Sequence, residues 1–387
     1  MEKQDSESTV ALGECRQPIV WVADSAQLDV LCERWKSLSW LALDTEFMRI
    51  DTFYPVPALL QINDGTASYL IDPLSLDDVT SLRALMESPD VQKVLHACSE
   101  DLEVFQILLN CLPVNLLDTQ VAAAFCGYGY SVGYANLVRA VLGVQLPKDE
   151  TRSNWLQRPL TDAQQRYAAL DVEYLYQITL HLKEQLAKLG RGSWVQEECD
   201  LMVPAFLESQ KLSNSSARFR GAWRLNQRQL AVLMELAAWR DQTAQSQNIV
   251  RGHVLRDKSV FAIAETLPTH ISQLRKVPEL SDKLIRRYGD RVIEIVEQVR
   301  AMPEEDLPPR LPRPPGTAQQ TRINEMRDAL AQVAEELKVA PEYLARRKDF
   351  EFIMRALQEG KSGDDLFPAS LSGWRSEFVK PCLQKFL

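Results

Sequence analysis

Two carboxylates, Asp44 and Glu46, stand two residues apart in the apolar segment WLALDTEF, residues 40–47. Because side chains alternate across a β-strand, both would point to the same face of the strand. Two like charges beside a hydrophobic core repel each other and lose their hydration, unless a positive charge lies between them. The pair therefore points to a divalent cation, although one pair alone does not establish it.

Three further residues add to this pair. Asp101 lies in HACSEDLEVF (96–105), near the expected start of an amphipathic helix that follows a strand. Tyr167 and Asp171 are four residues apart in QRYAALDVEYLY (165–176), so both would emerge on one face of a helix. Each has an ordinary alternative, since an acidic residue also suits a helix start, where the helix dipole favours negative charge. Together they suggest a constellation of four acids and a phenol.

Four carboxylates and a phenol suit hydrolysis of a phosphodiester with two metal ions about 3.5–4 Å apart. Ligands that are all oxygen atoms favour Mg²⁺ or Mn²⁺ over zinc. A phenol whose pKa is near 10 is a poor base, so Tyr167 would orient the attacking water by a hydrogen bond. The expected metal ligands are Asp44, Glu46, Asp101 and Asp171.

The elements that must position these residues follow from the hydrophobic periodicity. Strands are expected at 19–23, 41–47, 58–64, 68–72 and 91–97, and amphipathic helices at 27–38, 76–88 and 100–112. The GTA segment, residues 65–67, has the length of a hairpin turn. A hairpin followed by alternating helices and strands predicts an α/β domain with a mixed sheet.

After about residue 120 the pattern becomes mostly helical, with two compact helical blocks at 225–300 and 320–387. The segment 301–316 between them has six prolines in sixteen residues, which is typical of a stiff linker. The expected organisation is listed here: a mobile N-terminal tail at 1–17, an α/β domain at 18–210, a small all-α domain at 211–300, the linker at 301–316 and a second small all-α domain at 317–387.

Charge is distributed unevenly along the 387 residues. The net charge is −9, but residues 1–150 hold 9 basic and 22 acidic residues, whereas residues 211–387 hold 29 and 23. A polyanionic partner is therefore compatible with the sequence, provided that metal ions mask the acidic part. The basic residues interleaved with aromatic rings in SSARFRGAWRLNQR (215–228) suit phosphate contact and base stacking.

The remaining bulk features restrict the setting. No apolar run approaches the roughly 20 residues that span a bilayer, and the polar N-terminus does not have the pattern of a secretory signal. The seven cysteines are scattered and contain no C-x-x-C, so neither disulfides nor a zinc site is expected. A reduced, cytoplasmic compartment fits best.

The segments DTEF, HACSEDLEVF and YAALDVEYLY resemble the three motifs of the DEDD superfamily of exonucleases, in its tyrosine-bearing branch. Longer segments, DTEFMRIDTFYPVPALLQI, KVLHACSEDLEVF, LLDTQVAAAF and RPLTDAQQRYAALDVEYL, resemble those of the ribonuclease D family. The two helical blocks resemble the paired HRDC domains of that family. The resemblance covers residues 18–387.

The resemblance implies a ribonuclease H-like exonuclease domain followed by two HRDC-like domains. It also implies a metal-dependent 3′–5′ exoribonuclease that releases 5′-mononucleotides and trims tRNA precursors, with Asp44, Glu46, Asp101 and Asp171 binding metal and Tyr167 orienting the water. We expect a monomer. Two alternatives stay open at this point: an exonuclease acting on DNA, and an RNA-binding protein without catalytic activity.

Five residues are candidates for contacting the substrate. Phe47 could stack on terminal bases, or it could be a core residue. His96 could lie near the scissile phosphate, or it could be a hydrogen-bonded residue at a strand end. Arg218, Arg220 and Arg224 could contact RNA, or they could belong to a solvated hinge between domains.

Overall fold

The computed structural model describes residues 11–146, 150 and 153–387, and the chain forms two compact units. Unit 1 comprises Met1–Met48, Val56–Pro204 and Pro315–Leu387, and unit 2 comprises Arg49–Pro55 and Ala205–Pro314. This division differs from the expected order of domains in two ways. The C-terminal helices belong to the same unit as the α/β sheet, and a short segment of the α/β region belongs to unit 2.

A six-stranded mixed sheet forms the centre of unit 1, in the order β2-β5-β4-β3-β6-β7. Its strands are β2 (Ile19–Val22), β3 (Trp40–Met48), β4 (Val56–Asn63), β5 (Ser68–Ile71), β6 (Gln92–Leu95) and β7 (Leu116–Asp118). Strand β4 is antiparallel to β3 and to β5, and the other neighbours are parallel. The five predicted strands, the hairpin between β4 and β5 and the mixed α/β class are confirmed.

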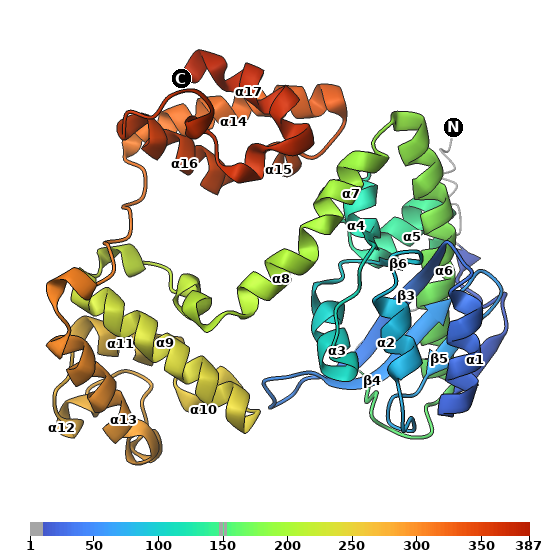
Figure 1. Cartoon of the computed structure of the whole chain (residues 1–387), viewed down its shortest axis with the longest axis horizontal. Helices are drawn as coiled ribbons and strands as arrows, with labels where there is room; N and C mark the ends of the chain where they lie inside the picture. The colour runs from blue at the N-terminus through green and yellow to red at the C-terminus, as the bar shows by residue number, and fades with distance from the viewer. Residues whose placement is uncertain (1–10, 147–149, 151–152) are drawn as a thin grey trace, which may run out of the picture. The chain divides into compact units, whose positions relative to one another are not determined.

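Helices cover the sheet on both faces (Figure 1). The helices of this part are α1 (Ser25–Trp35), α2 (Thr80–Met86), α3 (Ser99–Leu109), α4 (Thr119–Phe125), α5 (Tyr134–Leu142), α6 (Asp162–Leu189) and α7 (Gly192–Asp200). The next helix, α8 (Met202–Gln210), begins in unit 1 and ends in unit 2. The three predicted helices correspond to α1, α2 and α3. The long helix α6 packs along β2, β3, β4 and β5, so one face of α6 is fixed against the sheet.

The start of α6 is defined by a reciprocal cap. The Thr161 hydroxyl accepts a hydrogen bond from the Gln164 backbone N–H, and the Gln164 side chain accepts one from the Thr161 backbone N–H. Such a pair satisfies two donors that a helix N-terminus otherwise leaves unpaired. The helix ends before Gly190, which adopts a left-handed φ of 66°.

Residues 11–17 depart from the mobile tail expected over 1–17, and residues 1–10 lie outside the described residues. Strand β1 (Ala11–Leu12) pairs in parallel with β8 (Val144–Gln145). The backbone N–H of Glu14 donates to the Tyr174 hydroxyl at 3.0 Å, and that of Arg16 donates to the Glu173 carboxylate at 3.1 Å. Partners distant in the sequence therefore hold this segment in place.

The C-terminal helices of unit 1 are α14 (Thr317–Leu337), α15 (Pro341–Leu344), α16 (Arg347–Gln358) and α17 (Ser376–Leu383). They share one hydrophobic cluster with α4, α6 and α7. The Trp374 ring stacks on Trp194 with the ring centroids 4.8 Å apart. Beside them, the buried guanidinium of Arg375 pairs with the buried Glu198 carboxylate at 2.5 Å. The second helical block is thus packed against the α/β part.

Unit 2 contains α9 (Gln227–Gln247), α10 (Arg251–Val254), α11 (Asp257–Thr266), α12 (Ile271–Leu274) and α13 (Asp282–Ala301) around its own hydrophobic cluster. Arg240 lies within it, 1% exposed, with its guanidinium paired to Asp241 and Asp257.

The proline-rich segment contains a short 3₁₀ turn at Glu304–Asp306. Among the residues that the structure describes, no helix is both long and apolar enough to cross a bilayer.

Candidate active site

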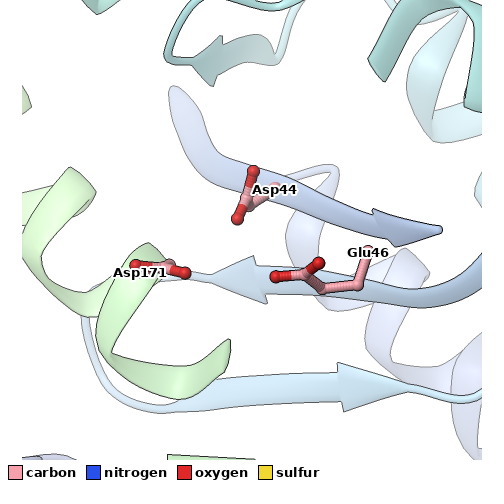
Figure 2. A group of neighbouring side chains, drawn as sticks. All are labelled: Asp44, Glu46 and Asp171. Atoms are coloured by element: carbon pink, nitrogen blue, oxygen red, sulfur yellow. The ribbon is translucent and has the colours of Figure 1, made fainter. Parts of the chain in front are cut away.

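Three of the predicted acids converge in unit 1. Asp44 and Glu46 lie on β3, Asp171 lies on α6, and one carboxylate oxygen from each lies within 4.8 Å of the other two. Figure 2 shows the three carboxylates directed toward a common space between the strand and the helix. Residues 125 positions apart in the sequence therefore meet because α6 packs along the central strands.

The sequence explains why β3 presents two acids at this place. The first half of β3 is buried, including Leu41, Ala42 and Leu43, as expected for a strand with neighbours on both sides. The second half is partly exposed, and a bulge follows Glu46, where the register with β4 shifts. A bulge bends a strand and redirects its side chains, and it is common beside active sites. The acids thus lie where the buried part of the strand ends.

A cavity of about 230 Å³ surrounds the acids. It is lined by Asp44, Thr45, Glu46, His96, Tyr134, Tyr167, Asp171 and Leu175. Four of these residues come from β3 and the β6–α3 connection, and the others come from the start of α5 and from one face of α6. The lining combines carboxylates, two phenols and an imidazole, which is a polar site at the edge of a hydrophobic core.

The carboxyl groups resist ionisation in this setting. Burial raises the pKa of Asp44 well above its usual value, and the neighbouring charges of Asp101, Asp171 and Glu46 raise it further. Burial and the same kind of repulsion raise the pKa of Glu46 to about 9. Burial raises the pKa of Asp171 to about 8, although a hydrogen bond from Tyr167 opposes the shift. A cluster whose ionisation is opposed by burial and mutual repulsion is suited to a cation, which offsets the repulsion.

The fourth predicted acid, Asp101, lies beside the cluster but is not one of the three converging groups. It lies in the first turn of α3, and its carboxylate accepts a hydrogen bond from the Thr45 hydroxyl at 2.5 Å. Burial raises the pKa of Asp101 to about 6, and the Thr45 hydrogen bond opposes this shift. The charge of Asp101 is close enough to raise the pKa values of Asp44 and Glu46.

Tyr167 lines the cavity one helical turn before Asp171, on the same face of α6, as the four-residue spacing predicts. Its hydroxyl is hydrogen-bonded to the Asp171 carboxylate. Burial is the main cause that raises the pKa of the Tyr167 phenol, and the charge of Asp171 adds to it. The phenol therefore stays protonated and can donate or accept a hydrogen bond, but it is not a base.

His96 also lines the cavity, and both of its ring nitrogens have protein partners. Nδ1 lies 3.0 Å from the Thr119 hydroxyl and Nε2 lies 3.1 Å from the Val132 carbonyl oxygen. Burial lowers the pKa of the imidazole, which favours the neutral form. Its ring is thus a fixed part of the cavity wall, in line with the alternative of a hydrogen-bonded residue at a strand end.

The other candidates for substrate contact lie outside the cavity. Phe47 is partly buried on β3 just after the bulge, and it does not line the cavity. In unit 2, the Arg218 guanidinium pairs with Asp241 and donates to the Ser215 carbonyl oxygen, which gives it a role in packing. Arg220 and Arg224 are exposed, and the Arg224 guanidinium lies 5.5 Å from the centre of the Trp223 ring.

Three residues of the cavity were not predicted from the sequence. Thr45 stands between the two acids of β3, and Leu175 follows Asp171 by one helical turn. The Tyr134 hydroxyl donates to the backbone carbonyl oxygen of Asp171. Leu175 could have been found from its spacing. The fold alone brings Tyr134 into contact with α6, because nothing in the segment GYSVGYANL indicates that contact.

The donor set fits divalent metal. All the converging groups are carboxylates, the ligands that hard cations prefer, and their mutual repulsion is relieved by a positive charge. No cysteine or imidazole nitrogen belongs to this group of ligands among the described residues. The site is therefore consistent with Mg²⁺ or Mn²⁺ and not with a structural zinc site.

A mixed sheet of this order, with acids on a central strand facing a tyrosine and an acid of one helix, defines a metal-dependent nuclease domain. The sequence model of the 3′–5′ exonuclease family matches residues 19–187, and that of the HRDC domain matches residues 229–296. The protein is thus an exonuclease with a helical HRDC module. A second HRDC domain at 317–387 stays a prediction.

Relatives identify the family. Ribonuclease D of Pseudomonas paraeruginosa is 42% identical over 359 residues, which cover 93% of this chain and 95% of the relative. Ribonuclease D of Escherichia coli K12 is 36% identical, with 92% and 95% covered. The crystal structure of Escherichia coli RNase D, described as an exoribonuclease involved in structured RNA processing, superposes with a TM-score of 0.86 at 34% identity, and 96% of this chain and 99% of that chain are covered. The chain belongs to the ribonuclease D family and is an exoribonuclease.

Proposed function

We propose that this exoribonuclease removes nucleotides from the 3′ end of RNA as 5′-monophosphates, uses two divalent cations, Mg²⁺ or Mn²⁺, and trims the 3′ extensions of tRNA precursors. The observation that carries the proposal is the convergence of the Asp44, Glu46 and Asp171 carboxylates beside the Tyr167 hydroxyl. Membership of the ribonuclease D family supports the direction of degradation and the choice of RNA.

The polar residues of the cavity have separate tasks in this proposal. Asp44, Glu46 and Asp171 hold the cations, and Asp101 joins them from the start of α3, where Thr45 fixes its carboxylate. Cations held by these acids would lower the pKa of a water and would stabilise the charge that develops on the leaving 3′ oxygen. The Tyr167 hydroxyl, held beside Asp171, orients that water by a hydrogen bond.

Tyr134 positions α6, the helix that carries Tyr167 and Asp171. Its hydroxyl donates to the backbone carbonyl oxygen of Asp171 and fixes this turn of α6 relative to the start of α5. The neutral His96 ring, tied to Thr119 and Val132, closes the wall beside it. A rigid wall of this kind orients a bound nucleotide without contributing charge.

RNA contact outside the cavity is assigned to the exposed arginines of unit 2. Residues 211–300 hold 16 basic and 9 acidic residues, which suits a polyanion. Arg220 and Arg224 are the candidates, with Trp223 as a surface on which a base could stack.

The seven free cysteines support a reducing, cytoplasmic setting. We also propose that the enzyme works as a monomer.

The test is degradation of a 5′-labelled RNA with a 3′ extension, beside a DNA strand of matched sequence. We expect a ladder of shortened RNA and 5′-mononucleotides with Mg²⁺ or Mn²⁺, no product with EDTA, and slow loss of the DNA, since the 2′-hydroxyl is the group that distinguishes the two. Equal degradation of both strands would favour the DNA alternative. Binding of RNA without cleavage at saturating metal would favour the non-catalytic alternative.

A further inference from the structure

The tip of the β3–β4 hairpin, residues Arg49–Pro55, belongs to unit 2, whereas the strands on either side of it belong to unit 1. This hairpin tip begins three residues after the metal-binding Glu46. Among the segments of unit 2, it therefore lies nearest to Glu46 along the sequence. The other covalent connections run through α8 and the proline-rich segment.

Asn248 holds the backbone of the hairpin tip. Its Oδ1 accepts hydrogen bonds from the backbone N–H groups of Phe53, at 3.1 Å, and Tyr54, at 3.0 Å. The backbone N–H of Val250 also donates to the Asp51 carbonyl oxygen at 3.3 Å. Asn248 caps the C-terminus of α9 with a left-handed φ of 47°, a conformation that asparagine tolerates better than most residues. Because it lies at the end of a 21-residue helix, the backbone of Asn248 is fixed by that helix.

Phe53 fixes the hairpin tip by burial. It is 7% exposed and belongs to a hydrophobic cluster with Ala244, Val254 and Tyr288. The Arg251 guanidinium lies over its ring, 4.5 Å from the centroid, and pairs with the Asp241 carboxylate at 3.1 Å. The aromatic ring is thus enclosed between α9, α10 and α13, with a cation held against its face.

These contacts bear on Glu46 through the short chain that joins them. The register between β3 and β4 shifts at the bulge between Glu46 and Phe47, and the pairing resumes at Phe47 and Met48. The strand continues only to Met48 before the hairpin tip begins. A tip that is anchored at Phe53 would therefore limit the motion of the end of β3, to which it is joined directly, and through it the motion of Glu46.

We propose that unit 2 positions the catalytic strand by gripping the hairpin tip, with Asn248 and Phe53 as positioning residues for Glu46. The proposal deepens the proposed function, because it concerns the same metal-binding acids. The helical unit then contributes to turnover itself as well as to RNA binding. If unit 2 held the hairpin tip without positioning Glu46, loosening the tip would change only the stability of the protein or only its affinity for long RNA.

The decisive variant in the full-length protein is Asn248→Gly. Glycine keeps the left-handed φ without strain and removes only the acceptor for the two backbone N–H groups. Asn248→Asp restores an acceptor at the same position and serves as the rescue. Ser246→Ala, an exposed change in the last turn of the same helix, is the matched control. Phe53→Ala tests the apolar half of the grip independently.

Three kinds of measurement are made on each variant: amide hydrogen exchange of residues 49–54, the dissociation constant for Mn²⁺ by calorimetry, and kcat and KM on a dinucleotide and on a long RNA. For Asn248→Gly and Phe53→Ala we expect faster exchange of the hairpin tip, weaker Mn²⁺ binding, and a kcat on the dinucleotide about tenfold lower, because misplacing a catalytic group by a fraction of an ångström is costly. Asn248→Asp and Ser246→Ala should match the wild type.

Two results would overturn the proposal. One is unchanged exchange of the hairpin tip in Asn248→Gly, since the acceptor then does not hold it. The other is a freed tip with unchanged Mn²⁺ binding and unchanged dinucleotide kcat, even if KM for long RNA rises. If the wild type fails to cut RNA, the proposed function fails, whereas exchange and Mn²⁺ binding still decide whether the hairpin tip positions Glu46.

Discussion

Repulsion among the acids dominates the chemistry of individual residues in this enzyme. Asp44, Glu46 and Asp171 bring carboxylates within 4.8 Å of one another in a half-buried cavity, and burial together with the neighbouring charges raises their pKa values. A bound cation would remove the repulsion and add the electrostatic stabilisation that phosphodiester cleavage needs. We therefore expect these acids to lower the stability of the metal-free protein and to be essential for the activity of the metal-bound protein.

The substitution Asp44→Asn separates these two effects. It keeps the size of the side chain and removes one negative charge, so we expect the metal-free protein to be at least as stable as the wild type. Activity with Mg²⁺ should fall by about 10³-fold or more, because a metal ligand is lost. Thermal unfolding with EDTA and exonuclease assays with Mg²⁺ measure the two quantities. A variant that unfolds more readily and still cuts RNA at the wild-type rate would contradict the assignment.

Stability without metal should depend on pH in a defined direction. The folded protein retains protons on Glu46, whose pKa is about 9, and on Asp171, whose pKa is about 8, that the unfolded chain releases near pH 4. The folded state therefore binds more protons than the unfolded state, and the free energy of unfolding falls as the pH rises between about pH 4 and pH 9. Saturating Mn²⁺ should reduce this fall, because cations replace the protons.

Melting temperatures from about pH 5 to pH 9, with EDTA and with Mn²⁺, test this dependence. The double variant Asp44→Asn/Asp171→Asn serves as the control and should show a shallower slope in EDTA. Equal slopes for the wild type in EDTA and in Mn²⁺ would show that the cluster does not bind the ion.

Tyr167 provides a third prediction at the scale of the residue. Tyr167→Phe keeps the ring that lies 6.0 Å from Trp155 and removes the hydroxyl beside Asp171. We expect kcat to fall by about 10²-fold with little change in Mn²⁺ affinity, as for the loss of a group that orients a reacting water. Tyr128→Phe, which removes a hydroxyl that contacts His181 away from the cavity, is the matched control. A similar loss in both variants would indicate a general structural effect.

Secondary-structure elements set the geometry of the cavity. Strand β3 delivers two acids at the point where its buried half ends, and α6 delivers an acid and a phenol one turn apart. Both placements follow from local sequence rules, since i and i+2 share a face of a strand and i and i+4 share a face of a helix. For this reason the sequence alone predicts these four residues, the strands around them and the α/β class.

Other features of the elements depend on contacts that no local rule contains. Residues 11–17 are polar, but they are fixed by Glu173 and Tyr174, which lie far along the chain. The basic and aromatic residues around Arg218 predict an RNA contact, but in the structure the Arg218 guanidinium is paired with the Asp241 carboxylate. The packing of residues 315–387 against the α/β part could not be predicted either, because the aromatic and ionic partners become neighbours only in the fold.

The buried pair of Glu198 and Arg375 provides a prediction at this scale. Both side chains are less than a tenth exposed, so Arg375→Met leaves a buried carboxylate without its cationic partner, although Trp374 Nε1–H still donates to it at 2.9 Å. We expect the free energy of unfolding to fall by about 3–5 kcal/mol. The double variant Glu198→Met/Arg375→Met should recover much of the loss, since no uncompensated charge remains. Denaturant unfolding of the wild type, both single variants (Arg375→Met and Glu198→Met) and the double variant tests this, and additive losses would contradict it.

At the scale of the whole molecule, the charge is divided between an acidic catalytic part and a basic helical part. Residues 1–150 hold 9 basic and 22 acidic residues, and residues 211–300 hold 16 and 9. Phosphate contacts release counterions, so affinity for RNA should fall steeply with salt. The dinucleotide reaches only the cavity, and its turnover should change much less.

The double variant Arg220→Ala/Arg224→Ala tests this division. We expect weaker binding of long RNA and a salt slope smaller by about 1–2, with kcat on the dinucleotide unchanged. Arg291→Ala, an exposed arginine paired with Glu294 on α13, is the matched control. An unchanged salt slope in the double variant would move the RNA contact to another surface.

The most direct test is an anomalous diffraction map from crystals of the full-length protein soaked in Mn²⁺. The proposed mechanism predicts two Mn²⁺ peaks about 3.5–4 Å apart among the carboxylates of Asp44, Glu46, Asp101 and Asp171. Saturating Mn²⁺ that leaves no peak between these four side chains would contradict the assignment of the active site.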